Sequence, residues 1–208
     1  MFGKVIFYIV TVGLAATILF ISILRTASPE YSFSQPPSLS GNSSGQDMEI
    51  DYELAPPGKV LPDSPLWSFK VARDKVWLAI TPSHTRKAEI DLLFADKRLA
   101  AAKILFEKGN FELGYPTLLK GETYLLEAFD HANRGKDQGM DVTWSLTRIT
   151  LASLKHRQVI DEMLVVAPED ARPDIEKTKG ISINVYKMAR DELNELGKPV
   201  PESPFEWD

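Results

Sequence analysis

Three histidines are the side chains in this sequence best suited to bind a metal ion or to exchange protons near neutral pH. They are His84, His131 and His156. No two of them are four residues apart, so none form a pair of ligands along one face of a helix. His84 is close to Arg86 and Lys87, which disfavour a divalent cation. His131 follows Asp130, and neighbouring helical residues point to different faces.

His156 is the most informative of the three because it falls on the apolar stripe of a predicted helix. Two interpretations remain open. The preferred one is a core or boundary histidine that is hydrogen-bonded to a neighbour or lies at a helix edge. The other makes His156 a weak candidate for metal binding or pH sensing, together with nearby acidic residues. We therefore assign no metal ligand.

Other common catalytic patterns are missing from the sequence. There is no cysteine, which excludes a thiolate metal site and a cysteine nucleophile. No Glu-x-x-His motif supports a di-metal helical bundle, and the glycine-rich turn at 135–139 lacks the order of a phosphate-binding loop. Ser153 and His156 share a helix face but have no acidic partner to complete a triad. We expect no catalytic residue, no cofactor and no enzymatic activity.

The elements that must position His156 are long helices. One apolar seam recurs at an average of 3.5 residues and alternates small with large side chains, which is typical of a helix packed along another helix. A second seam, a short turn later, repeats small residues every seven positions and predicts an intramolecular hairpin with the first. The two seams comprise Ala88, Leu92, Ala95, Leu99, Ala102 and Phe106, and then Gly114, Leu118, Gly121, Leu125 and Ala128.

The pattern as a whole predicts an all-α domain, an antiparallel bundle of one short and four long helices. We expect Ser64 to cap the short helix and Thr81 to cap the long helix that carries the first seam. Asp141 is expected to cap the helix that carries His156. No segment shows the strict alternation of apolar and polar residues that marks a strand.

The N-terminal residues 1–25 predict a signal-anchor transmembrane helix. Residues 5–24 form an uncharged apolar run of about 30 Å, the thickness of a bilayer core. A cleaved signal peptide is the alternative. Lys4 and Arg25 flank the run and give only a slight preference for a cytoplasmic N-terminus with the remaining chain outside.

Two further segments flank the predicted domain at 58–197. Residues 26–57 are rich in serine and proline and predict a disordered linker. Residues 198–208 form a proline-rich acidic tail that ends with Phe205 and Trp207. This aromatic pair is either a docking peptide or part of an untethered end.

The opening of the domain resembles a family of bacterial proteins, domain of unknown function 5667. The resemblance rests on Leu61–Trp67 with Lys70, on Leu78–Pro82, and on Ala95–Ala100, and it is best over residues 60–107. It implies a helical domain behind a signal or anchor helix. It implies no activity and no catalytic residue.

These features predict a non-enzymatic interaction or scaffold module at the bacterial cell envelope, tethered to the membrane through residues 5–24. Its expected partner is an envelope protein. Nucleic acid is not expected, because the net charge is −5 and no basic block is present. The alternative is an envelope sensor that binds a metal or small ligand within the bundle.

Overall fold

The computed structural model describes residues 8, 11–12 and 50–205 of the chain, which divides into two units at residues 1–37 and 38–208. In the first unit, Tyr8, Thr11 and Val12 are helical. The predicted anchor at 5–24 otherwise lies outside the described residues, as does the linker up to residue 49. Among the residues that are described, no helix is long and apolar enough to cross a membrane.

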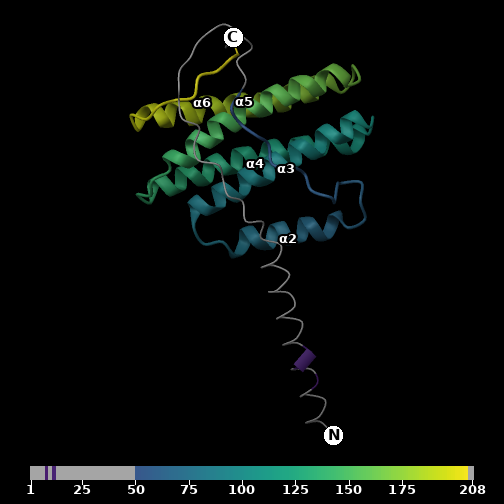
Figure 1. Cartoon of the computed structure of the whole chain (residues 1–208), viewed down its shortest axis with the longest axis horizontal. Helices are drawn as coiled ribbons and strands as arrows, with labels where there is room; N and C mark the ends of the chain where they lie inside the picture. The colour runs from purple at the N-terminus through teal and green to yellow at the C-terminus, as the bar shows by residue number, and fades with distance from the viewer. Residues whose placement is uncertain (1–7, 9–10, 13–49, 206–208) are drawn as a thin grey trace. The chain divides into compact units, whose positions relative to one another are not determined.

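Five helices make up the described part of the second unit (Figure 1). They are α2 (Trp67–Ile80), α3 (His84–Glu107), α4 (Phe111–Asp137), α5 (Thr143–Val166) and α6 (Arg172–Glu195). The described residues contain no strand, which confirms the prediction of an all-α domain. The helix α2 has 14 residues and the other four have 24 to 27, as expected for one short and four long helices.

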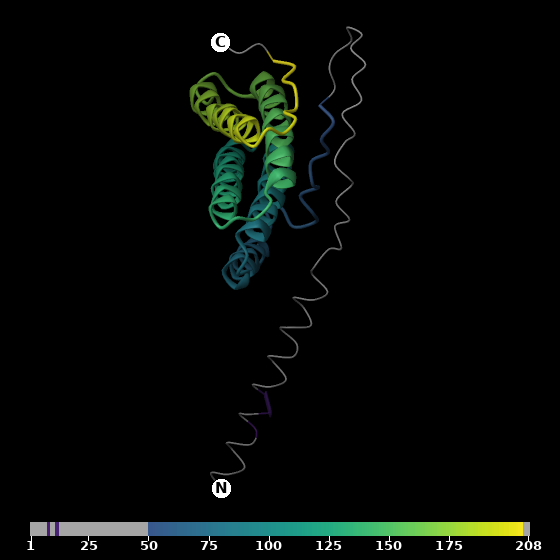
Figure 2. The ribbon, with the colours of Figure 1, turned by 90° about the vertical axis from the view of Figure 1, so that its left-hand side faces the viewer.

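The four long helices form two hairpins that stack on each other (Figures 1 and 2). Helix α3 packs along α4, and α5 packs along α6, while α3 also contacts α5 and α4 contacts α6. The hairpin turn before α4 contains Gly109 and the turn before α5 contains Gly139, with φ angles of +73° and +76° that favour glycine. Helix α2 lies outside the four-helix bundle and packs on α3.

Both predicted seams lie in the interior. Every residue of the seam on α3, from Ala88 to Phe106, is buried, and so is every residue of the seam on α4, from Gly114 to Ala128. The packing of α3 against α4 therefore has the intramolecular form that the repeated small residues indicated.

At Gly121 the backbones of α3 and α4 come close together. A Cβ atom at this position would lie 3.2 Å from the Leu99 amide nitrogen, 3.3 Å from the Ala95 carbonyl oxygen and 3.2 Å from the Arg98 Cβ. Two of these three atoms belong to the backbone, which cannot move aside as a side-chain end can. A side chain at this position would therefore push the α3 backbone away by a few tenths of an ångström, which favours glycine here despite its cost of about 1 kcal/mol within a helix.

The three predicted helix caps are displaced from the observed ones. Helix α3 is capped by Ser83, whose side chain accepts from the Arg86 amide, whereas Thr81 closes α2 and donates to the Trp77 carbonyl. Ser64 lies three residues before α2 begins and accepts from the Leu66 amide. Asp141 accepts from the Thr143 amide, but the N-cap of α5 is Val142. A local serine, threonine or aspartate signal places a helix start only to within a few residues.

The compact part of the chain is longer at both ends than residues 58–197. Residues 50–57, here called the strap, were predicted as part of a disordered linker, yet Ile50, Tyr52 and Ala55 are each only 8% exposed. In the tail, Pro201 is buried and its carbonyl accepts a hydrogen bond from the Tyr186 hydroxyl at 3.2 Å. Apolar contacts at sparse positions hold both segments, and such contacts leave no periodic signal.

The close approach of α3 and α4 predicts opposite effects for two Gly→Ala substitutions. Gly121→Ala should destabilise the fold by about 1–3 kcal/mol, because the added Cβ meets backbone atoms of α3. Gly180→Ala, in α6, has nothing within 4 Å of its new Cβ and should stabilise by about 0.5–1 kcal/mol. Urea unfolding of both variants measures this. An equal gain in the free energy of unfolding in both variants would mean that α3 and α4 do not approach closely at Gly121.

Candidate functional site

The bundle interior contains a histidine held between two carboxylates. His156 on α5 donates from Nδ1 to Glu122 Oε1 of α4 at 2.7 Å and from Nε2 to Asp96 Oδ1 of α3 at 3.1 Å. His156 and Glu122 are fully buried and Asp96 is 3% exposed. Three helices thus contribute one charged or titratable group each to a single cluster, and this cluster is named the His156 cluster.

The strap also hydrogen-bonds to the His156 cluster. The Tyr52 hydroxyl donates to Asp96 Oδ2 at 2.9 Å, and the Ala55 amide approaches the same oxygen at 3.4 Å. The Arg148 guanidinium of α5 lies 5.1 Å from the centre of the Tyr52 ring. The strap is therefore attached to the bundle through a buried carboxylate as well as through apolar packing.

The cluster keeps the imidazole protonated. Burial by itself lowers the pKa of His156, but the charge of Glu122 and the hydrogen bonds to Asp96 and Glu122 outweigh it and raise the pKa to about 9. Burial and the negative charge of Asp96 raise the pKa of Tyr52 well above its usual value. Near neutral pH the histidine is an imidazolium and the tyrosine is a neutral hydrogen-bond donor.

This geometry leaves the imidazole without a free nitrogen lone pair. A metal ligand or a general base needs an unprotonated ring nitrogen, and both nitrogens of His156 donate to carboxylates instead. Within the described ranges, no group of three or more histidine or acidic side chains could hold a metal ion. Ser153, on the same helix, donates to the Ile149 carbonyl at 2.7 Å. The arrangement links helices together, as the preferred interpretation of His156 anticipated.

A second buried ionic group fixes α2 to α3. Arg98 of α3 approaches Asp74 of α2 at 3.3 Å, and its guanidinium lies 4.0 Å from the centre of the Trp67 ring. Lys70 donates to the Pro57 and Val60 carbonyls at 2.6 and 3.0 Å. Burial, followed by the charge of Arg98, lowers the pKa of Lys70 to about 8. Helix α2 and the segment that leads into it are therefore held by polar contacts.

The opposite face of α2 is apolar and open to solvent. Leu66, at its N-cap, is 57% exposed, Phe69 is 76% exposed and Ile80 is 64% exposed. Ala72 is also exposed and Val76 is half-buried, so the apolar positions follow the helical period along this side. This surface, from Leu66 to Ile80, is named the α2 face.

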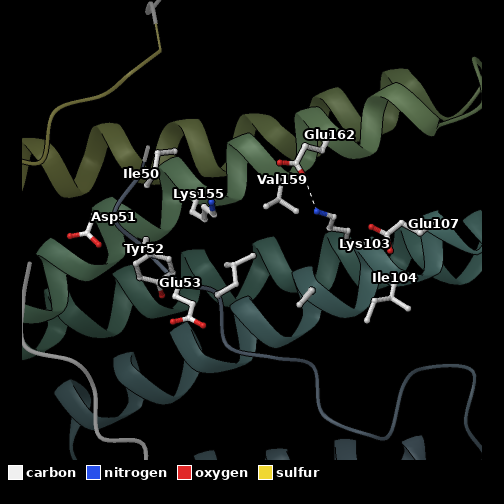
Figure 3. Close-up of a pocket in the computed structure, with 12 residues that line it drawn as sticks. Ile50, Asp51, Tyr52, Glu53, Lys103, Ile104, Glu107, Lys155, Val159 and Glu162 are labelled. Atoms are coloured by element: carbon white, nitrogen blue, oxygen red, sulfur yellow. Dashed lines mark hydrogen bonds and ion pairs between the residues drawn. The ribbon is translucent and has the colours of Figure 1, made fainter. Parts of the chain in front are cut away.

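A cleft of about 780 Å³ lies between the strap, α3 and α5 (Figure 3). Ala100, Ile104 and Val159 contribute its apolar lining. The ion pair between Lys103 Nζ and Glu162 Oε2, at 2.6 Å, joins α3 to α5 beside it. The strap forms one wall of this cleft, so the position of the strap determines its shape.

The structure also brings together two histidines that the sequence analysis treated separately. His84, at the start of α3, and His131, on α4, have Nδ1 atoms 3.1 Å apart, although 47 residues separate them. The buried carboxylate of Asp91 lies 3.7 Å from Nε2 of His131. The search for ligand pairs within one helix missed this group. Only the antiparallel pairing of the two seams, extended to the helix ends, could have suggested it.

The family described as Domain of unknown function (DUF5667) matches residues 59–202. The match extends well beyond the segment 60–107 on which the sequence resemblance was best, and it includes all five helices. Comparison with curated proteins and with solved structures gave no match.

The His156 cluster predicts a decline in stability from mildly acidic to alkaline pH. The pKa of His156 is about 9 in the folded protein, against 6.5 for an ordinary histidine. The protonated histidine therefore stabilises the fold fully below pH 6.5, and this stabilisation is lost as the pH rises to 9. The loss should be on the order of 3 kcal/mol. Urea unfolding of the wild type and His156→Gln across this range measures it.

The control compares the two proteins at each pH. The stability of His156→Gln should lack this decline, because glutamine does not titrate. Lys70 has a pKa of about 8 in the folded protein, so its deprotonation makes the stability of both proteins rise by the same amount above pH 8. Parallel curves for the two proteins would mean that His156 is not held as an imidazolium.

Proposed function

The chain belongs to the DUF5667 family of unknown function, and on that premise we propose that it is a non-enzymatic interaction module at the bacterial cell envelope. In this proposal residues 5–24 anchor the chain in the membrane with the N-terminus in the cytoplasm. The helical domain then lies outside the cytoplasm and binds an envelope protein through the α2 face.

The proposal rests on helix α2, which has apolar residues on two sides. The bundle covers only its inner side. Its inner side contacts α3, where the Trp77 and Phe94 rings meet at a centroid distance of 5.8 Å. Its outer side exposes Leu66, Phe69 and Ile80. A helix with apolar residues on both sides is typically covered on both, so the α2 face fits a complementary apolar helix of a partner.

The tether is supported by the apolar run at 5–24, which has the length of a bilayer-spanning helix. Because the strap packs on the bundle, residues 50–57 belong to the domain and not to the linker predicted over residues 26–57. A shorter connection keeps the domain closer to the membrane surface.

The non-enzymatic part of the proposal is supported by the His156 cluster. Its only imidazole is a protonated donor to two carboxylates, which suits an ionic link between helices. Of the two buried carboxylates, Asp96 accepts hydrogen bonds from His156 and Tyr52, and Glu122 accepts one from His156.

The sensor function is a second candidate, and the cleft in Figure 3 is the observation that favours it. A volume of about 780 Å³ is within the range of small-molecule sites. Since the strap forms one wall, a ligand in the cleft would contact the segment that connects the domain to its proposed anchor. This candidate uses the cleft and not the His156 cluster.

Crosslinking on intact cells tests the interaction and the outside placement together. A membrane-impermeant, amine-reactive crosslinker should capture a protein partner through Lys75, which is exposed on α2 one helical turn from Ala72. The captured peptide should come from an amphipathic helix. Capture only after cell lysis would contradict the placement outside the cytoplasm.

Two matched variants then test the α2 face with the purified partner. Phe69→Glu should weaken binding by about 2–4 kcal/mol, the range of an interface hot spot, without changing the free energy of unfolding. Val165→Glu is the control, because Val165 is 78% exposed on α5. Equal effects of the two variants on binding would show that the partner does not dock on the α2 face.

A further inference from the structure

We propose that His84 and His131 form a two-nitrogen binding site for a divalent transition-metal ion, with Asp91 as a positioning residue behind His131. The proposal is independent of the interaction function of the α2 face. It rests on the convergence of two imidazoles from different helices and on a buried carboxylate that lacks a full set of partners.

The two imidazoles present facing nitrogens at a distance suited to one metal ion. Their Nδ1 atoms share a hydrogen bond at 3.1 Å, which a bound ion would replace, and their ring centroids are 5.2 Å apart with planes inclined by 33°. Two nitrogens that each lie about 2.0–2.1 Å from one ion, at an angle of about 90–110°, are separated by roughly 3 Å. The ion can therefore be accommodated with little movement of either backbone.

Asp91 provides the independent second observation. It is 1% exposed, its Oδ2 lies 3.7 Å from His131 Nε2, and its Oδ1 accepts no hydrogen bond from the described residues. Burial, followed by the nearby charge of Glu127, raises the pKa of this carboxyl to about 7. A buried carboxylate oxygen without a hydrogen-bond partner gains from a positive charge placed on the histidine beside it.

The position of Asp91 favours the tautomer that a metal requires. Asp91 Oδ2 lies 3.7 Å from His131 Nε2, which is longer than a hydrogen bond, but its charge favours a proton on Nε2 and thus a lone pair on Nδ1, the nitrogen that faces His84. Carboxylate–histidine–metal arrangements of this kind orient the ring and raise the basicity of the coordinating nitrogen. Burial, followed by the charges of His84, Lys87 and Arg134, lowers the pKa of His131.

The surrounding charges are mixed. Lys87 and Arg134 disfavour a cation at His131, whereas Asp130 favours it. Arg86, next to His84, is paired with Glu89. With two protein nitrogens and no third metal-binding group among the described residues, water completes the coordination. Imidazole-preferring ions, Cu²⁺, Ni²⁺ and Zn²⁺, are the expected ligands.

Isothermal titration of the full chain with Zn²⁺, Ni²⁺ and Cu²⁺ in turn tests the site. At least one ion should bind saturably with one ion per chain. His84→Asn and His131→Asn should each lower the affinity at least about tenfold, and the double variant should lose little more than either single variant. No saturable binding by the wild type, or unchanged binding in both single variants, would overturn the proposal.

Two further variants separate a positioning role from a general structural one. Asp91→Asn should lower the metal affinity about 10–100-fold while the metal-free protein keeps or gains stability, because a buried charge is removed. Glu162→Gln, on the distant rim of the cleft, should bind the metal as the wild type does. Wild-type affinity in Asp91→Asn would overturn the role of Asp91.

The Cu²⁺ complex offers a readout that a change in folding does not mimic. Its electron paramagnetic resonance spectrum should show hyperfine coupling to two imidazole nitrogens in the wild type and in Asp91→Asn. His131→Asn should show fewer. A wild-type spectrum in His131→Asn would place the ion elsewhere and contradict the proposal.

Discussion

The buried ionic contact of His156 with Asp96 and Glu122 is the interaction on which the remaining structure depends. Placing charged groups in a low-dielectric interior is costly, and removing one partner of such a group typically costs 3–5 kcal/mol because a charge is left uncompensated. The three side chains come from α5, α3 and α4. Their mutual hydrogen bonds fix the axial register of these helices more narrowly than apolar packing does, since leucine and alanine seams tolerate sliding.

The close packing of α3 and α4 makes this ionic contact possible. Gly121 lies against the backbone of Ala95 and Leu99. Glu122 directly follows Gly121 and Asp96 directly follows Ala95, and these two residues are the carboxylates of the His156 cluster. A larger residue at the crossing would push the two helices apart and lengthen the hydrogen bonds from one imidazole to the two carboxylates. The repeated small residues therefore have a consequence beyond packing, because they bring together the charges that hold His156.

Most of the fold could be predicted from the sequence, because long helices with a regular seam leave a strong periodic signal. The seam of Ala95 and Gly121 indicated both the helices and their pairing, and His156 was recognised as a seam residue. The strap was not recognised, since Ile50 and Tyr52 are isolated apolar residues in a serine- and proline-rich segment. Their partners are distant in sequence. The His84–His131 pair was missed for the same reason, as only the tertiary fold places the start of α3 beside α4.

The protonation state of His156 is the most direct test of this account. Nitrogen-15 NMR of the uniformly labelled protein distinguishes a ring with two protonated nitrogens from a neutral tautomer. If the ionic contact is present, both ring nitrogens of His156 carry protons at pH 7.5 and the ring titrates with a pKa of about 9. A neutral ring at pH 7.5, with one unprotonated nitrogen, would contradict the ionic contact on which the register of α3, α4 and α5 depends.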